Sequence, residues 1–517
     1  MKLTELLYPF AFLPVCLVLY YVLPKRCRNA ALLAASLLFF AWGTPEYLVL
    51  LALAILLNYF AGLELESLLE DGKTGHARLV LVLTILADLL PLLFFKYYGE
   101  AAAALNRVFV LSLPVHALPA PVGVSFYTFT LLSALSDVYH GRAPMEKNLI
   151  RFALFVSFFP KLTSGPIVQY ADMQPQLEPH EFVRERVGSG MRLFVIGLAK
   201  KVILAGLLGT PFYALKALGP QALSVCGAWL GALLYALMLY FDFSGYSDMA
   251  IGAAKMFGFE FLANFDYPYC ADSVAAFWRR WHMSLGFWFR TYIYIPLGGS
   301  RCGTARTICN LLLVWLLTGI WHGAAATFVV WGLYYGLLLI LEKFVLRDAL
   351  ARVPAILRRV LTFLLVVIGW VPFFSDTLGQ AGAWLARMFS AGQAGFVDAA
   401  ARYYLRTAWP VLLIAVFAAL PYGCRFGNRF FRAGRTVSMV SSLYFIGLLL
   451  LCIAGMVNGT YVSFLYAQFC REAWIRASFT GKTDARAEAD GPPPPDPAGP
   501  GGAGDLHPRG VRGDQPL

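Results

Sequence analysis

Long runs without a formal charge constrain this chain more than any other feature of its sequence. The stretch from Leu311 to Leu341 contains no lysine, arginine, aspartate or glutamate. About 20 consecutive apolar residues suffice for a helix to cross a bilayer. We therefore predict an all-α polytopic membrane protein with roughly ten to thirteen spanning or re-entrant helices. The apolar stretches that support this prediction lie approximately at residues 6–23, 30–42, 47–63, 78–95, 122–138, 148–160, 191–209, 223–241, 307–320, 325–346, 357–374, 409–421 and 440–458.

The composition agrees with a membrane protein. Hydrophobic residues make up 59% of the chain and charged residues 14%, with a mean hydropathy of +0.64, whereas soluble domains carry roughly 25% charged residues. The net charge of +12 could indicate a nucleic-acid partner, but the basic residues lie in short clusters between apolar stretches. Such clusters hold cytoplasmic loops in place, so we expect no nucleic acid.

The two ends of the chain differ in character. No small-residue cleavage site follows the stretch at 6–23, so we predict a retained first span. Lys25, Arg26 and Arg28 come directly after it, which places this loop in the cytoplasm and the N-terminus outside. Residues 481–517 are rich in proline and glycine and cannot bury a core. We predict a helical membrane domain over 1–475 and a disordered cytoplasmic tail over 481–517.

Two polar islands interrupt the apolar stretches with proline and glycine. They are LPAPVGVSFYTF at Leu118 to Phe129 and FPKLTSGPIVQY at Phe159 to Tyr170. Proline and glycine break the helical hydrogen-bond ladder. In lipid, broken helices persist only where protein or a water-filled cavity covers the free backbone groups. The islands are therefore either ordinary loops or broken helices that line a cavity.

A third island, YFDFSGYSDMAIG at Tyr240 to Gly252, ends an apolar run with several polar side chains. Carboxylates at membrane depth are costly and usually face an interior, so Asp242, Ser244 and Tyr246 are candidate substrate contacts. Asp242 and Asp248 do not share a helical face cleanly. We therefore predict no acid/base pair of carboxylates here.

The segment after this island is rich in tryptophan and arginine. If residues 274–289 form one helix, Trp278, Trp281, Leu285 and Trp288 share a face. This pattern is typical of an amphipathic helix at a membrane interface. A functional interpretation, in which this segment contributes to a site, competes with it.

Two histidines, His282 and His322, each directly follow a tryptophan, Trp281 and Trp321. A single histidine in an apolar helix is more often structural. Around His322, however, Gly319 and the small residues after the histidine leave room for close helix packing or a ligand. Burial favours the neutral imidazole, which can act as a general base.

Other chemistries fit the sequence less well. The nine cysteines are scattered without a CxxC pair, and no cysteine and histidine spacing suits zinc. There is no GxSxG elbow, no HExxH and no Walker motif. We predict no metal site and no bound cofactor.

Four motifs in order, YFDFSGYSDMAIG, FWRRWHMSL, YIPLGGSR and TGIWHG, resemble the membrane-bound O-acyltransferases. The resemblance covers the membrane domain and is closest to the bacterial branch that acetylates alginate, with the cellulose and peptidoglycan branches nearby. It implies a helical fold around a transmembrane tunnel, with His322 as the essential histidine and His282 as its polar partner. Further substrate or donor contacts are expected at Trp278, Arg279, Arg280, Trp281, Asp242, Ser244, Tyr246 and Trp321. Under this resemblance, Arg279, Arg280 and Arg290 are available for the phosphates of an acyl donor.

The resemblance also implies an activity. The expected reaction moves an acetyl group from acetyl-CoA in the cytoplasm, across the bacterial inner membrane, to O-acetylate an extracytoplasmic polysaccharide. A periplasmic acetyltransferase or polysaccharide-modifying partner is expected to take part. Two alternatives remain at this point: a transporter or channel with a polar tunnel and no covalent chemistry, and a structural scaffold in which both histidines are dispensable.

Overall fold

The computed structural model describes residues 3–109, 111–115, 120–422 and 434–459, and these contain helices but no strand. The predicted tail at 481–517 lies outside the described residues. The α-helices are α1 (Leu13–Val22), α2 (Lys25–Gly43), α3 (Leu48–Glu70), α4 (Thr74–Phe109), α5 (Val124–Tyr139), α6 (Leu149–Ser157), α7 (Phe159–Leu162), α8 (Tyr170–Met173), α9 (Arg184–Ala199), α10 (Gly206–Leu218), α11 (Val225–Met256), α12 (Val274–Trp278), α13 (Met283–Phe289), α14 (Thr304–His322), α15 (Ala326–Ile340), α16 (Arg347–Arg352), α17 (Ala355–Phe374), α18 (Leu378–Phe389), α19 (Ala399–Ala418) and α21 (Gly434–Val457).

Shorter 3-10 and π-helical turns join several of these helices. They are η1 (Tyr8–Phe12), η2 (Pro45–Tyr47), η3 (Gln174–Gln176), η4 (Lys200–Ala205), η5 (Pro268–Cys270), η6 (Arg290–Tyr294) and η7 (Leu341–Val345).

Within the described part of the chain, eight helical segments are long and apolar enough to cross a membrane. This confirms the predicted all-α polytopic class. Among the remaining apolar stretches, Tyr8–Val22 and the 16-residue α5 form shorter helices. The eight segments are Pro45–Glu70, Thr74–Phe109, Arg184–Leu218, Val225–Met256, Thr304–His322, Ala326–Val345, Ala355–Phe374 and Met439–Val457.

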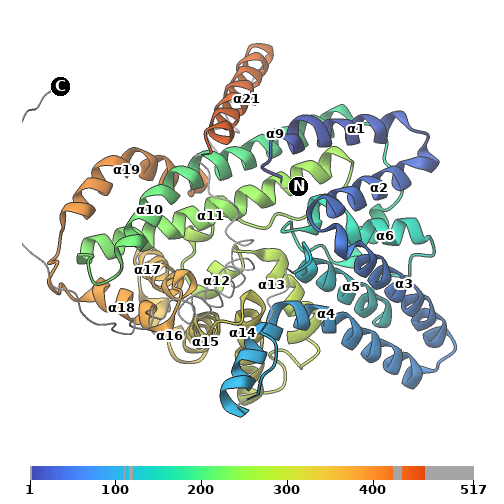
Figure 1. Ribbon diagram of the computed structural model, residues 1–517, viewed down its shortest axis with the longest axis horizontal. Coiled ribbons are helices and arrows are strands. Elements are labelled where there is room, and N and C mark those ends of the chain that lie inside the picture. The colour runs from blue at the N-terminus through green and yellow to red at the C-terminus, as the bar shows by residue number, and fades with distance from the viewer. Residues whose placement is uncertain (1–2, 110, 116–119, 423–433, 460–517) are drawn as a thin grey trace, which may run out of the picture. The chain divides into compact units, whose positions relative to one another are not determined.

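The long helix α11 packs lengthwise along α9, η4 and α10, which Figure 1 shows in green. Glycines make this contact close. A Cβ on Gly245 would lie 2.6 Å from the carbonyl oxygen of Gly197, and one on Gly252 would lie 2.6 Å from that of Gly190. Small residues allow helix backbones to approach each other in this way. The third polar island therefore continues α11 and is buried against α9 and η4.

Helix boundaries fall at both proline-and-glycine islands. Gly123 has φ 73° immediately before α5 begins. A Cβ there would lie 2.1 Å from the carbonyl oxygen of Leu162, so the position requires glycine. The second island contains the four-residue helix α7, which is separated from α6 by a break at Phe158.

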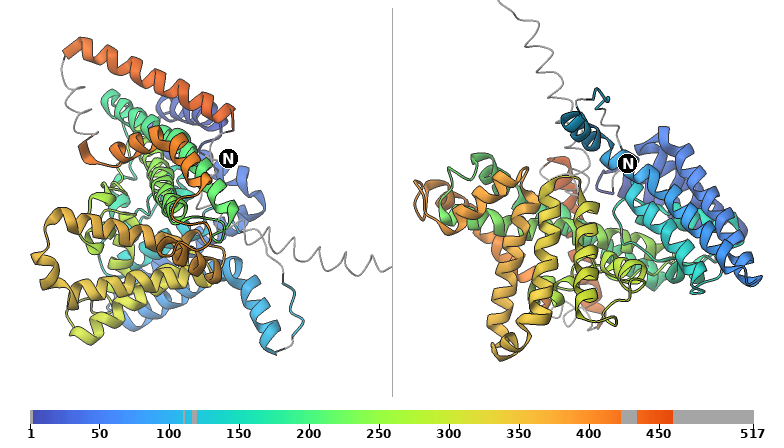
Figure 2. Two further views of the ribbon diagram at one scale, coloured as in Figure 1. Left: turned by 90° about the vertical axis from the view of Figure 1, so that its left-hand side faces the viewer. Right: turned by 90° about the horizontal axis from the view of Figure 1, so that it is seen from below.

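The helices α14, α15 and α17 lie next to one another, and α12 packs against α15 and α17 (Figures 1 and 2). Residues 274–289 do not form one continuous helix, so the condition for Trp278, Trp281, Leu285 and Trp288 to share one helical face is not met. Helix α12 ends at Trp278 and α13 begins at Met283, and His282 between them has φ 45°. A left-handed residue cannot continue a right-handed helix. Because of this break, His282 lies in the turn between α12 and α13 rather than on the face of a helix.

Candidate active site

Two histidines from separate segments of the chain lie near one tryptophan, Trp321. His322 is the last residue of α14, and His282 directly precedes α13. The ring centroid of Trp321 lies 4.9 Å from that of His322 and 6.3 Å from that of His282. The two imidazoles are also close enough to interact electrostatically. The structure therefore brings together the histidines predicted from the sequence.

Aromatic rings surround this histidine pair. Trp331 and Phe373 lie 4.9 and 5.2 Å from the ring centroid of His322. Phe243 of α11 lies 4.6 Å from that of His282. Rings at these distances exclude bulk water, so charge that develops here interacts strongly with nearby dipoles.

The backbone of His282 is in a conformation that few side chains adopt. It is one of two non-glycine residues with positive φ in the described ranges, and its side chain is 3% exposed. Such a conformation costs of order 1–3 kcal/mol and persists only where the surroundings enforce it. Burial also lowers the pKa of His282 to about 3. The imidazole is therefore neutral at physiological pH.

Side chains of helix α4 form hydrogen bonds with the C-terminal end of α14, where His322 lies. The Tyr97 hydroxyl donates to the carbonyl oxygen of Ile320 at 2.5 Å, and the Lys96 ammonium donates to that of Trp321. Carbonyls in the last turn of a helix have no partner within the helix. Lys96 and Tyr97 supply one, and Lys96 also interacts electrostatically with His322. The sequence analysis did not identify this pair.

Asn264, in the loop after α11, was also missed by the sequence analysis. Its side-chain oxygen lies 3.2 Å from Nδ1 of His282 and 3.1 Å from the backbone nitrogen of Ser284. Its Nδ2 donates to the Ser247 hydroxyl at 3.0 Å. Asn264 is 1% exposed. A single asparagine in a loop carries no periodic signal, and only the fold brings it to the histidine.

A cavity of about 250 Å³ lies beside His282. His282 and Arg290 border the two ends of α13, which forms one of its walls. Arg279 and Arg280 do not line it, and Arg279 is exposed. Of the three predicted arginines, the structure places Arg290 at the cavity. The lining residues are Trp278, Trp281, His282, Leu285, Gly286, Phe289, Arg290, Tyr294, Leu311, Val314, Trp315 and Thr318.

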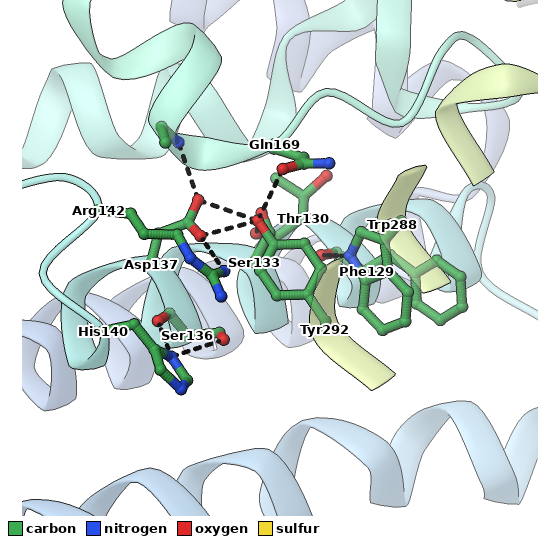
Figure 3. Close-up of polar contacts among 11 residues, drawn as sticks. Phe129, Thr130, Ser133, Ser136, Asp137, His140, Arg142, Gln169, Trp288 and Tyr292 are labelled. Atoms are coloured by element: carbon green, nitrogen blue, oxygen red, sulfur yellow. Dashed lines mark hydrogen bonds and ion pairs between the residues drawn. The ribbon is translucent and has the colours of Figure 1, made fainter. Parts of the chain in front are cut away.

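Helix α5 anchors the segment that forms this wall. The indole of Trp288 stacks on Phe129 with ring centroids 4.0 Å apart, and its Nε1 donates to the Phe129 carbonyl oxygen (Figure 3). Phe129 also stacks on Trp321 at 5.5 Å. The stack links α13 to the residue before His322.

The buried carboxylate of Asp137 holds the next turn, η6, in place through a hydrogen bond. The Tyr292 hydroxyl lies 2.9 Å from both carboxylate oxygens of Asp137, as Figure 3 shows. Arg142 and the backbone nitrogen of Ala171 also donate to Asp137, at 3.0 and 2.9 Å. Asp137 is fully buried and satisfied by these donors. Arg290 and Tyr294, in the same turn as Tyr292, are thereby held at the cavity.

The candidates on the third island lie outside the residues that line this cavity. Asp242 forms a buried ion pair with Lys201 of η4, and the Tyr246 hydroxyl shares a hydrogen bond with Thr163. Ser244 is 1% exposed. Asp248 pairs separately with Lys200 at 2.7 Å. The two carboxylates thus have different lysine partners, consistent with the expectation that they form no acid/base pair.

Across the described ranges, no group of three or more histidine, cysteine, aspartate or glutamate side chains could hold a metal ion. The fold and the site define a multi-pass helical membrane protein with a histidine pair enclosed by aromatic rings. A neutral imidazole, such as that of His282, suits proton transfer in such surroundings.

Comparison with known proteins identifies the family. A sequence profile of the membrane-bound O-acyltransferase family matches residues 144–348. The probable alginate O-acetylase AlgI of Pseudomonas aeruginosa is 43% identical over 391 residues, 74% of each chain. The peptidoglycan O-acetyltransferase of Helicobacter pylori is 34% identical over 411 residues, 72% of this chain and 77% of the relative. The teichoic acid D-alanyltransferase of Bacillus subtilis is 30% identical over 243 residues, 45% of this chain and 61% of the relative.

This chain belongs to the membrane-bound O-acyltransferase family. It is an O-acyltransferase, as the resemblance of its motifs implied. The matched region contains both histidines, the cavity wall α13 and Arg290.

Proposed function

We propose that this chain moves an acetyl group from acetyl-CoA in the cytoplasm across the bacterial inner membrane to O-acetylate an extracytoplasmic polysaccharide. A periplasmic partner passes the acetyl group to the polymer or presents the acceptor hydroxyl. Two relatives, a probable alginate O-acetylase and a peptidoglycan O-acetyltransferase, support acetyl transfer to alginate or peptidoglycan. The observation that carries the proposal is the neutral histidine at one end of an apolar cavity with a cation at the other.

The cavity matches a thioester donor in its arrangement of groups. Arg290 and His282 are separated by the seven residues of α13, about 12 Å at the rise of a helix. In the proposal, Arg290 binds a donor phosphate through charge-assisted hydrogen bonds. The apolar walls accept the thin arm that carries the thioester. Trp278 lines the cavity, and its indole N–H has no acceptor within the described residues, so a donor carbonyl would satisfy it.

The proposed chemistry is general base catalysis by the histidine pair. The acceptor hydroxyl oxygen attacks the thioester carbonyl carbon while an imidazole nitrogen of His322 takes the hydroxyl proton. The new C–O bond forms, the C–S bond breaks, and the imidazolium returns the proton to the departing thiolate. General acid and base catalysis of this kind contributes roughly 10²–10⁴-fold. The ring of Trp321 packs near both imidazoles and would help to hold their positions.

A transfer assay tests this proposal. Membranes with the wild type or His322→Gln at matched abundance receive acetyl-CoA labelled in the acetyl group, together with alginate or peptidoglycan and periplasmic extract. We expect label in polymer or partner protein with the wild type and a loss of about 10²-fold or more with the variant. The control is His140→Gln, because His140 is exposed at the end of α5 and bonds only locally.

The outcomes separate the alternatives. Transfer by His322→Gln at the wild-type rate would contradict the general-base role. Passage of an intact solute across the membrane, with no label transferred by the wild type, would favour the transporter instead.

A further inference from the structure

We propose that Asn264 is the positioning residue that fixes the tautomer of His282, so that Nδ1 carries the proton and Nε2 presents a lone pair to the reaction. The consequence for catalysis rests on the proposed function, whereas the tautomer itself does not. The hydrogen bonds around Asn264 determine the assignment step by step.

The orientation of the Asn264 amide is fixed by an unambiguous donor. The backbone nitrogen of Ser284 lies 3.1 Å from the atom placed as Oδ1, and a backbone N–H can only donate. That atom is therefore the amide oxygen. The amide nitrogen then donates to the Ser247 hydroxyl at 3.0 Å. The reversed amide would place two donors against each other at Ser284.

The hydroxyl of Ser284 agrees with this orientation. It accepts a hydrogen bond from the backbone nitrogen of Ile167 at 3.1 Å, so its own proton is available for Asn264 Oδ1 at 3.0 Å. Each of these contacts has one donor and one acceptor. The network is thus consistent with only one amide orientation.

The tautomer of His282 follows from the same oxygen. Nδ1 of His282 lies 3.2 Å from Asn264 Oδ1. A lone pair on Nδ1 would repel the lone pairs of this amide oxygen, so Nδ1 must carry the hydrogen. A neutral imidazole has one N–H. Nε2 is therefore unprotonated and can only accept a proton. A base whose tautomer is set by its other nitrogen is a common device in catalysis and metal binding.

The backbone of the same loop holds the unusual conformation of His282. The Met283 nitrogen donates to the Asn264 carbonyl oxygen at 2.9 Å, and the Asp266 nitrogen donates to that of Arg280 at 3.0 Å. The loop thus bonds on both sides of His282, whose φ is 45°. Asn264 therefore holds His282 through both its side chain and its backbone carbonyl. Its burial at 1% exposure removes water as a competing partner.

Nitrogen-15 NMR of purified protein labelled at histidine tests the tautomer without any assay of transfer. His282 is assigned by comparison with His282→Gln. We expect a protonated Nδ1 and an unprotonated Nε2 at neutral pH. The opposite tautomer would overturn the proposal.

The pH profile of transfer tests the role in catalysis. Asn264→Asp keeps the size of the side chain and the acceptor oxygen but places a negative charge beside Nδ1. An opposite charge at this distance raises the pKa of an imidazole by about 1–3 units. In the proposed function His322 takes the acceptor proton, and His282 shares it through Nε2. A higher pKa of His282 should therefore move the acidic limb of the rate profile to higher pH by at least about one unit. An active, folded variant with the wild-type profile would overturn the role.

Ser247→Ala is the matched control, because it removes the other partner of the Asn264 amide and leaves the contact with His282. We expect its acidic limb to stay at the wild-type position. An equal shift in both variants would show a structural effect and contradict the proposal. If the wild type transfers no acetyl group but NMR shows the expected tautomer, the proposed function fails and the tautomer assignment stands.

Discussion

At the scale of single residues, the site depends on side chains whose surroundings determine their chemistry. His282 is neutral because it is buried, and its backbone is left-handed because neighbouring segments hold it there. The surroundings also distinguish the arginines, because Arg290 lines the cavity whereas Arg279 and Arg280 do not. Position in the fold, rather than residue type, decides which of them can meet a ligand.

Arg290 provides a prediction about donor binding. Arg290→Gln removes a charge that lines the cavity, and hydrogen bonds to charged groups contribute about 1.5–3 kcal/mol. We expect the apparent KM for acetyl-CoA to rise about tenfold or more, with little change in protein abundance. Arg279→Gln is the matched control, because Arg279 is exposed outside the cavity. Equal effects of the two substitutions would exclude Arg290 from the donor site.

Asp242 provides a prediction about stability. Asp242→Asn leaves Lys201 as a buried cation without its counter-ion, which destabilises proteins by about 3–5 kcal/mol. We expect a marked fall in the thermal unfolding temperature in detergent. The neighbouring pair of Asp248 with Lys200 is partly exposed, so Asp248→Asn should cost only about 1 kcal/mol or less. A role for Asp242 in substrate binding alone would instead lower activity and leave the unfolding temperature unchanged.

At the scale of elements, interrupted helices and close crossings build the site. The break between α12 and α13 presents His282, and the end of α14 presents His322. Close contacts between helices at glycine positions determine where these helix ends lie. A Cβ on Gly319 of α14 would lie 2.5 Å from the carbonyl oxygen of Phe328 at the start of α15. The small residues noted in the sequence around His322 therefore serve helix packing.

The crossing of α9 and α11 yields a test at this scale. Gly245→Ala would place a Cβ 2.6 Å from the Gly197 carbonyl oxygen and 2.9 Å from the Lys201 nitrogen. Overpacking of this kind destabilises by about 1–3 kcal/mol, and we expect a lower unfolding temperature. Gly382→Ala in α18 meets no atom within 4 Å, and alanine should stabilise that helix by about 0.5–1 kcal/mol. A neutral Gly245→Ala would contradict the close contact.

At the scale of the whole described region, the site joins two packed clusters. Trp281 belongs to the cluster around α10, α11 and α17, whereas Leu285, Trp288 and Trp321 belong to the one around Phe129 of α5. In the sequence, His282 lies between Trp281 of the first cluster and Leu285 of the second.

The sidedness of the membrane domain can be measured with native cysteines. Cys27 is exposed beside the basic residues after the first apolar stretch, and Cys302 is exposed in the turn after η6, close to Arg301. Basic loops stay in the cytoplasm, so we expect both to react with a membrane-impermeant maleimide only from the cytoplasmic side. Variants that retain one of these cysteines separate the signals. Labelling of Cys302 from outside would place the Arg290 end of the cavity on the wrong side for acetyl-CoA.

The sequence by itself determined the membrane class, the helical fold, the helix breaks at the proline-and-glycine islands and the two histidines. These follow from local rules: apolar length, missing backbone donors and motifs in fixed order. Tertiary structure alone decided that Asn264, Lys96 and Tyr97 meet the histidines, that Asp242 pairs with Lys201 and that Arg290 faces the cavity. Such contacts join residues far apart in the chain. No periodicity or propensity records them, because they depend on where separate helices end and cross.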